Sequence, residues 1–105
     1  MEKFCMVLVT AGNADNAKEI AETLVAEKLG ACVQMTEINS VYVWNGEVCR
    51  DPEILMLIKT RSDLFEAVKN RIAEVHTYEV PEILKFDIAD GNKEYLQWVT
   101  EQTTK

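Results

Sequence analysis

Residues 41–59 read VYVWNGEVCRDPEILMLIK, and this run predicts a β-hairpin. Its centre, Asn45-Gly46, is the dipeptide favoured in two-residue hairpin turns, because both turn positions need a positive φ. An extended run from Ala31 to Trp44 leads into the turn, and the returning strand is clearest from Glu53 to Lys59. These arms are longer than the strands they can pair with, so we expect the hairpin tip to project beyond the rest of the domain.

Three other segments carry the signals of helices. Asn13 or Asp15 can cap the first helix, since a short oxygen-bearing side chain satisfies the free N–H groups of a first turn. Gly30 is expected to end this helix in the left-handed conformation. Ser62 can cap a second helix, and a short third helix follows Gly91-Asn92.

The order of these elements predicts an α+β fold of the ferredoxin-like type. Strand candidates at Phe4–Thr10 and Ile83–Ile88 lie on either side of the hairpin in the sequence, with a helix in each interval. The resulting βαββαβ order gives a four-stranded antiparallel sheet with helices on one face, here followed by an additional C-terminal helix. At 105 residues the chain fits one domain, residues 1–105.

Two of the predicted strands are apolar on both sides. A sheet with one wet face alternates apolar and polar residues, yet residues 4–9 and 54–58 are apolar at every position. The two main helices can cover one face only, so we expect another copy of the chain to cover the other. Exposed strand edges invite such pairing, and a closed ring would satisfy them. These patterns do not choose between two, three or more subunits.

The composition argues against several classes of partner. Eighteen acidic and 11 basic residues give a net charge of -7, which disfavours nucleic acid and anionic membranes and modestly favours cations. The three cysteines are an odd number without a C-x-x-C pair, which indicates reduced thiols and a cytoplasmic location. The apolar run at residues 4–9 is too short to span a membrane.

The densest polar cluster is residues 76–82, HTYEVPE. His76 is the only histidine, and an imidazole can ligate a metal ion or move protons. Glu79 and Glu82 offer oxygen ligands beside it. The alternative is that His76 merely ends the second helix, where a partial positive charge suits the helix dipole.

The remaining candidates are less specific. Lys59-Thr60-Arg61 is either a solvated strand end or an anion-binding site, and Tyr42 and Trp44 are either interface residues or a stacking platform. Cys32 lies in an apolar strand, where a thiol behaves as a small inert hydrophobe, so Cys49 is the more reactive candidate. The sequence has no G-x-G-x-x-G, Walker A, G-x-S-x-G or H-E-x-x-H motif, so we predict neither an enzyme nor an organic cofactor.

Five short motifs in order resemble those of the CutA divalent-cation-tolerance family, over nearly the whole chain from Met6 to Thr100. The motifs are Leu29-Gly-Ala-Cys-Val33, Ser40-x-Tyr-x-Trp-x-Gly46, Glu53 with Leu57-Ile-Lys-Thr60, His76-x-Tyr-Glu-Val-Pro-Glu-Ile83 and Gly91-x-x-x-Tyr-Leu-x-Trp98. The resemblance implies a cytoplasmic homotrimer of ferredoxin-like subunits joined by their long hairpins. It also implies a role in tolerance of copper and other divalent cations.

The same resemblance suggests which residues form a site. It places His76, Tyr78 and Glu82 near a cleft between subunits, with Lys59 and Trp44 as neighbours. Copper or zinc would then be held by His76 and Glu82, with Cys32 as the candidate thiol. An alternative is a sensor similar to PII signalling proteins, in which Lys59, Tyr78 and Trp44 contact a small anionic metabolite or nucleotide in the cleft. Thr77 departs from the family, which usually has proline after this histidine.

Overall fold

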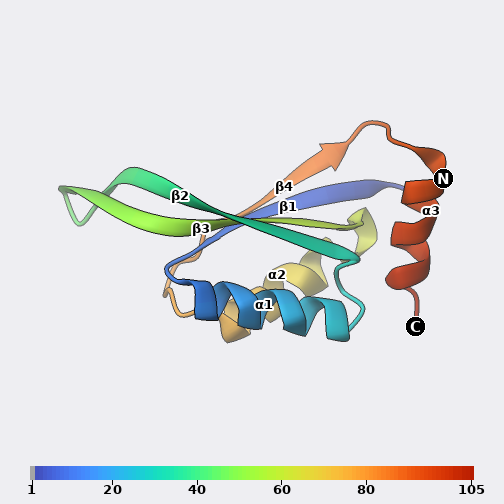
Figure 1. Ribbon diagram of the computed structural model, residues 1–105, viewed down its shortest axis with the longest axis horizontal. Helices are drawn as coiled ribbons and strands as arrows, with labels where there is room; N and C mark the ends of the chain where they lie inside the picture. The colour runs from blue at the N-terminus through green and yellow to red at the C-terminus, as the bar shows by residue number, and fades with distance from the viewer. Residues whose placement is uncertain (1) are drawn as a thin grey trace.

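The computed structural model describes residues 2–105 as one antiparallel sheet with helices packed against it (Figure 1). The four strands lie in the order β2-β3-β1-β4, with the bounds β1 Phe4–Ala11, β2 Cys32–Trp44, β3 Glu47–Arg61 and β4 Ile83–Ile88. The helices are α1 Ala14–Ala26, α2 Phe65–Val75 and α3 Lys93–Gln102, with a 3-10 turn η1 Ser62–Leu64 before α2. None of these helices in the described residues is long and apolar enough to cross a membrane. The order of strands and helices confirms the predicted ferredoxin-like fold.

Helix α1 begins as predicted and ends differently. The Oδ1 atom of Asn13 accepts a hydrogen bond from the backbone N–H of Asn16 at 2.8 Å, which satisfies a free donor of the first turn. The predicted role of Gly30 is wrong, because Lys28 takes the left-handed conformation with φ 59°. Gly30 instead donates its backbone N–H to the carbonyl of Leu24 at 3.2 Å. The turn therefore closes two residues earlier than the glycine suggested.

The start of α2 also differs from the prediction. The Ser62 side chain does not cap the helix, and its hydroxyl is buried without a hydrogen-bond partner among the described residues. The chain first makes the η1 turn, and α2 begins at Phe65. Leu64 stands at the cap position and offers no side-chain acceptor. Ser62 therefore correctly predicted that a helix follows. It does not, however, accept a hydrogen bond from the free N–H groups of the first turn of α2.

The hairpin between β2 and β3 forms as predicted, and its arms extend far beyond the neighbouring strand. Asn45 and Gly46 have φ values of 50° and 78°, as a tight two-residue turn requires. Strand β1 pairs with β3 only from Ile54 onward, so residues 47–53 have β2 as their only neighbouring strand. The chain measures 45 Å in its longest dimension, and Figure 1 shows the hairpin projecting at one end of it.

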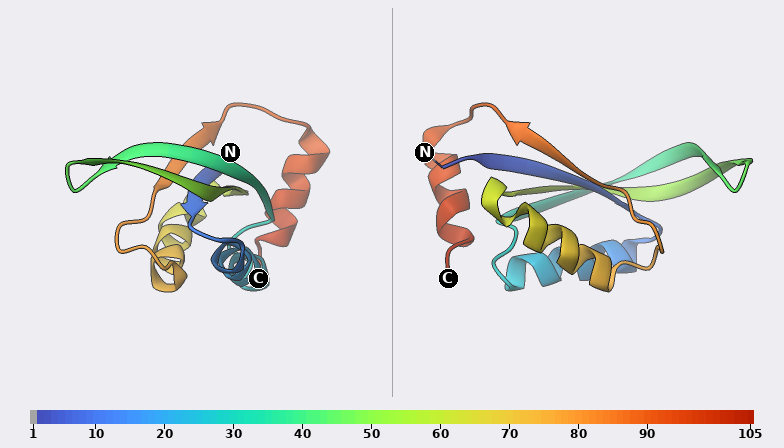
Figure 2. Two further views of the ribbon diagram at one scale, coloured as in Figure 1. Left: turned by 60° about the vertical axis from the view of Figure 1, so that its left-hand side comes forward. Right: turned by 180° about the vertical axis from the view of Figure 1, so that it is seen from behind.

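The core lies between the sheet and the two helices α1 and α2, which share one face of the sheet in both views of Figure 2. Its central side chains are fully buried, namely Val7, Val9, Ile20, Leu24, Met56, Ile58, Val68 and Ile72. Positions that alternate with them on β1 and β3, including Met6, Leu8 and Leu57, are only partly buried. No helix among the described residues covers this second face (Figures 1 and 2). Its burial by another copy therefore stays a prediction.

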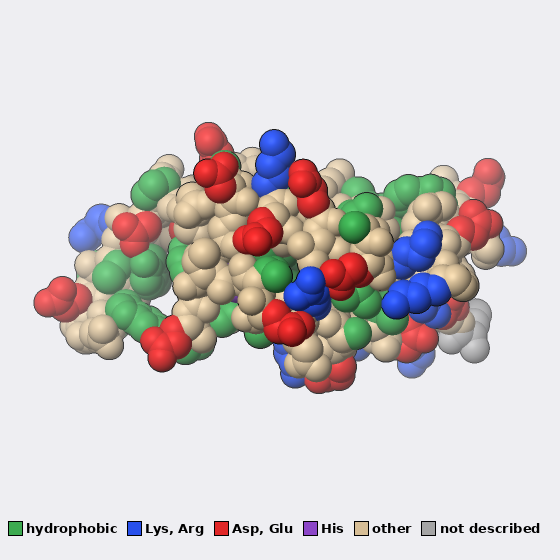
Figure 3. Space-filling view, turned by 90° about the horizontal axis from the view of Figure 1, so that it is seen from below, with side chains coloured by type: hydrophobic (Ala, Val, Ile, Leu, Met, Phe, Trp, Pro, Cys, Tyr) green, Lys and Arg blue, Asp and Glu red, His purple; other side chains and the backbone are tan. Residues whose placement is uncertain are grey.

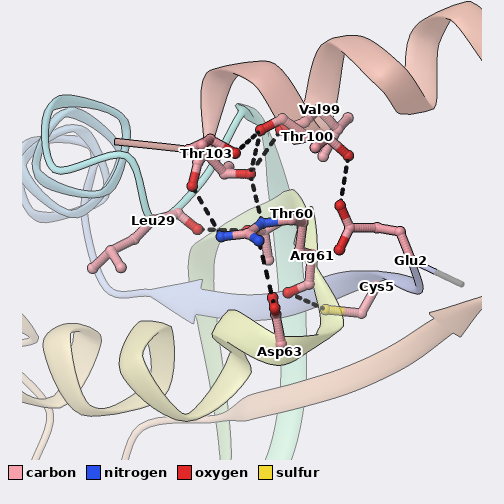
Figure 4. A network of polar contacts seen from close by, with 10 residues as sticks. Glu2, Cys5, Leu29, Thr60, Arg61, Asp63, Val99, Thr100 and Thr103 are labelled. Atoms are coloured by element: carbon pink, nitrogen blue, oxygen red, sulfur yellow. Dashed lines mark hydrogen bonds and ion pairs between the residues drawn. The ribbon is translucent and has the colours of Figure 1, made fainter.

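Helix α3 is fastened to the end of the sheet by Arg61 (Figure 4). The guanidinium donates to the Thr103 hydroxyl at 3.2 Å and to the Thr103 carbonyl at 3.1 Å, and it also pairs with Asp63 at 3.4 Å. The Thr100 hydroxyl donates to the carboxylate of Glu2 at 3.0 Å, which ties α3 to the start of the chain. The N–H groups of Arg61 thus bind Thr103 and Asp63 and hold the C-terminal segment in place.

Candidate functional site

The segment between α2 and β4, residues 76–82, crosses the end of β1. His76 follows the last residue of α2 and is 9% exposed. Its Nδ1 accepts from the backbone N–H of Tyr78 at 3.0 Å, and its Nε2 lies 2.8 Å from the carbonyl oxygen of Thr10. These partners fit the neutral imidazole with the proton on Nε2. A metal ion at Nδ1 would replace the hydrogen bond from Tyr78, whereas one at Nε2 would move the ring proton to Nδ1 and so break both hydrogen bonds.

Tyr78 connects this segment to the hairpin. Its hydroxyl donates to the Oε2 atom of Glu53 at 2.7 Å, and its ring centroid lies 4.8 Å from that of His76. Burial and the hydrogen bond to the Glu53 carboxylate raise the pKa of Tyr78. A Cβ atom at Gly12 would lie 2.9 Å from the Tyr78 hydroxyl oxygen, so a side chain at this position would push the Tyr78 ring aside.

A cavity of about 670 Å³ opens between the hairpin and residues 76–82. Its lining carries three carboxylates and three aromatic rings and includes no Lys or Arg among the described residues; these six are Glu53, Glu79, Glu82, Tyr42, Trp44 and Tyr78. The Tyr42 hydroxyl donates to Asp51 at 2.5 Å, and this bond raises the pKa of Tyr42 to about 12. The cavity is therefore acidic and aromatic.

The predicted metal ligands are only partly brought together. His76 and Glu82 both contact Thr10, because the Thr10 hydroxyl donates to the Glu82 carboxylate at 3.3 Å. Cys32 lies opposite Lys59 at the other end of the sheet, six residues along β3 from Glu53, which corresponds to roughly 20 Å. Within residues 2–105, no three His, Cys, Asp or Glu side chains are grouped closely enough to hold a metal ion.

Of the three residues predicted to contact a small molecule, two lie together and one lies apart. Tyr78 and Trp44 both line the cavity, as the prediction of a shared cleft requires. Lys59 does not line it, and its ammonium group donates to the side-chain oxygen of Gln34 at the far end of the sheet. An anionic ligand in this cavity would therefore meet carboxylates and no lysine from the described residues.

Two residues of the site carried only weak signals in the sequence. Glu53 was part of a family motif, but its burial at 8% exposure follows from the position of Tyr78 across it. The sequence signal for Glu53 was its place as a single acidic residue directly before the apolar run 54–58. Thr10 carried no sequence signal, because threonine is common at the end of a strand. In the structure it nevertheless contacts both His76 and Glu82.

The family model for the CutA1 divalent ion tolerance protein matches residues 5–102. The chain belongs to this family. A CutA relative from Thermus thermophilus, a divalent-cation tolerance protein, is 44% identical over 99 residues, covering 93% of this chain and 96% of the relative. The motifs of the hairpin and of residues 76–83 thus identified the family correctly.

Solved CutA structures share the fold over the whole chain. CutA1 from Pyrococcus horikoshii superposes with a TM-score of 0.93 at 38% identity, covering 96% of this chain and 99% of that one. A CutA from Archaeoglobus fulgidus, described as a periplasmic divalent cation tolerance protein, gives a TM-score of 0.93 at 35% identity, covering 99% and 100%. The long hairpin and the terminal helix therefore belong to the CutA architecture.

Proposed function

We propose that this CutA-family chain is a cytoplasmic homotrimer without catalytic activity that binds divalent copper or zinc and contributes to tolerance of these ions. The family match supports the link to divalent cations. The observation that carries the choice of site is the convergence of His76 and Glu82 on Thr10. Imidazole nitrogen and carboxylate oxygen are ligands that both Cu(II) and Zn(II) accept.

The exposed apolar surface supports assembly. Leu84 and Phe86 on the edge strand β4 are 47% and 46% exposed. Val41 and Val43 on the hairpin are each 68% exposed, and Figure 3 shows apolar side chains gathered at the hairpin end. Apolar surface of this extent on strands is typical of protein–protein interfaces. A ring would let each hairpin reach along its neighbour's sheet and would cover the open face of each subunit.

A trimer would also complete the metal site. Zinc sites use three or four protein ligands, whereas His76 and Glu82 are two. The further ligands in this proposal come from a neighbouring subunit, because Cys32 of the same chain lies at the opposite end of the sheet. When Nε2 binds the metal, its proton would move to Nδ1, so His76 would give up its hydrogen bonds to both the Thr10 carbonyl and the Tyr78 backbone N–H, and these two groups would then bond to water.

Calorimetric titration with Cu(II) and Zn(II) tests this proposal. His76→Ala and Glu82→Gln should each weaken binding by at least about tenfold, which corresponds to the loss of one ligand. Glu79→Gln, three residues from both, is the control and should bind as the unmodified protein does. Unchanged affinity in both ligand variants, with the trimer intact by sedimentation, would remove these residues from the site.

A sensor of anionic metabolites is a weaker proposal for this cavity. No Lys or Arg of the described residues lines it. Arg61, the other residue considered as an anion ligand, already bonds to Thr103 and Asp63.

The cytoplasmic location is a proposal because the relatives differ in location. The Archaeoglobus relative is described as periplasmic and a relative from Arabidopsis thaliana as chloroplastic.

A further inference from the structure

We infer that Asn16 is a positioning residue for His76, because its side-chain amide holds the backbone on both sides of the histidine. Nδ2 of Asn16 donates to the carbonyl oxygen of Val75 at 3.0 Å, and Oδ1 accepts from the backbone N–H of Thr77 at 3.2 Å. Val75 and Thr77 are the residues directly before and after His76. The direction in which the imidazole points is therefore set in part from α1.

The amide of Asn16 is buried and all of its hydrogen-bonding groups are used. The residue is 4% exposed. Besides the two backbone contacts, Oδ1 accepts from the Thr77 hydroxyl at 3.3 Å, and Nδ2 donates to Oε1 of Glu19 at 3.4 Å. Both amide protons and both lone pairs thus have partners. Because a carbonyl only accepts and a backbone N–H only donates, these partners allow one orientation of the amide.

The position of Asn16 is fixed by the start of α1. Its backbone N–H donates to Oδ1 of Asn13 at 2.8 Å, and the next residue, Ala17, is 1% exposed and belongs to the core. The start of α1 lies beside the end of α2 in both views of Figure 2. A side chain on a capped, packed helix is held more precisely than one on a loop. Asn16 is therefore a rigid support for the segment that follows α2.

The contacts of Asn16 differ from those of the His76 ring in one respect. The ring contacts, with Thr10 and with Tyr78, are both lost when Nε2 binds a metal ion. Asn16 contacts only the neighbouring residues and not the ring, so it keeps the imidazole in place when the ring contacts are gone. This last step rests on the proposed metal site. The positioning of the ring in the metal-free protein does not, and Asn16 is buried within a single chain whatever surface a neighbouring copy covers.

NMR of the metal-free protein distinguishes positioning from a merely structural role. His76 is the only histidine, so its ring nitrogen signals at about pH 8, where imidazole is neutral, report its tautomer directly. The unmodified protein should show the form with the proton on Nε2 and a slowly exchanging Tyr78 amide. Asn16→Leu, which removes the amide bonds at similar volume, should give a mixture of tautomers. It should also speed exchange of the Tyr78 amide by at least about tenfold.

Two further variants keep this test decisive. Asn16→Asp retains the size of the side chain and an acceptor for Thr77, but it places an oxygen against the Val75 carbonyl, so it should shift both signals in the same direction. Ile20→Val removes a buried methyl group from α1 and lowers stability without changing these hydrogen bonds, so it should leave both signals unchanged. A single tautomer and slow exchange in both Asn16 variants would overturn the inference. Equal changes in Ile20→Val would overturn it as well, since both signals would then follow stability alone.

Titration with Zn(II) separates this inference from the metal proposal. Asn16→Leu should weaken Zn(II) binding by about tenfold, as the loss of a residue that orients a ligand does. If binding falls in His76→Ala but not in Asn16→Leu, Asn16 does not position the ring in the bound state and the inference is overturned there. If neither variant changes binding, the metal proposal fails, and the tautomer and exchange measurements still decide whether Asn16 positions His76.

Discussion

The contacts of His76 constrain what this residue can do. Both ring nitrogens are occupied, one by the backbone N–H of Tyr78 and one by the carbonyl of Thr10. The same imidazole therefore fixes the turn after α2 and joins it to the end of β1. The sequence predicted a helix end and a metal ligand as alternatives for this histidine. It could not reveal the Thr10 contact, because the two residues lie 66 positions apart and meet only in the folded sheet.

Tyr42 provides a direct test of the electrostatics of the hairpin. Its hydrogen bond to Asp51 raises its pKa from 10.0 to about 12. Because the deprotonated phenolate would face a carboxylate, Asp51→Asn should move the pKa of Tyr42 back toward 10.0. NMR titration with ¹³Cζ-labelled tyrosine resolves each ring separately. Tyr95, remote from Asp51 on α3, serves as the internal control, and a Tyr42 titration near 10 in the unmodified protein would disprove the hydrogen bond.

Gly12 tests the close packing of Tyr78. A Cβ atom at Gly12 would lie 2.9 Å from the Tyr78 hydroxyl oxygen, so Gly12→Ala should displace this ring and destabilise the fold by about 1–3 kcal/mol. Gly91→Ala is the control, because its nearest neighbour would be an ordinary 3.6 Å from the added atom. Urea denaturation of both variants measures the difference. Equal stabilities would show that Tyr78 does not pack tightly over Gly12.

The elements of the fold were predictable where local chemistry determines them. Asn45-Gly46 formed the expected turn, and β4 has the predicted bounds, since its alternating sequence ILKFDI lies between Pro81-Glu82 and Asp90-Gly91. Strand β3 is longer than the predicted 53–59 because pairing with β2 extends it back to Glu47 and pairing with β1 extends it on to Arg61. The extension toward Glu47 was not predicted because most residues between Glu47 and Glu53 are polar. They are polar because this part of the hairpin has a single neighbouring strand and faces water.

The packing of α1 against α2 includes an ion pair whose effect depends on pH. Arg71 contacts Glu27 through two hydrogen bonds from Nε, at 3.0 and 3.1 Å, and one from Nη2 at 2.8 Å. These bonds lower the pKa of Glu27 below 4.5. A carboxyl group with a lowered pKa in the folded state stabilises the fold above its unfolded pKa, and this contribution is lost as the pH falls through the lowered value.

Glu27→Gln should therefore lower the melting temperature slightly at pH 7, since the pair is partly exposed and such pairs contribute little. The difference from the unmodified protein should disappear at acidic pH, below the lowered pKa of Glu27. Calorimetric melting at several pH values measures it. Glu22→Gln, on α1 and outside the ion pairs of the described residues, should show no such trend. A constant difference at every pH would contradict the ion-pair explanation.

At the scale of the whole molecule, the distribution of apolar surface is the main feature. The helices cover one face of the sheet (Figure 1), whereas β4 and the hairpin carry accessible apolar side chains, some of which Figure 3 shows at the hairpin end. The prediction that two strands are apolar on both sides is consistent with this asymmetry. The number of subunits could not be derived from it, because an apolar face indicates that a partner exists but not the symmetry of the assembly.

Substitutions on β4 should separate assembly from folding. Leu84→Ser removes an apolar side chain that is 47% exposed on the proposed interface, so it should shift the sedimentation profile toward smaller species. Val25→Ser on α1 has the same exposure of 47% and lies outside this surface, so it should leave the assembly unchanged. Both variants should keep the circular dichroism spectrum of the folded chain. If both dissociate equally, β4 has no special role.

The most direct test of the account is the mass of the unmodified protein in solution. Sedimentation equilibrium at micromolar concentration should give one species of about three times the 11.9 kDa mass of the chain. A single species with the mass of one chain over the same concentration range would contradict the proposed trimer. The metal site shared between subunits would then be lost with it.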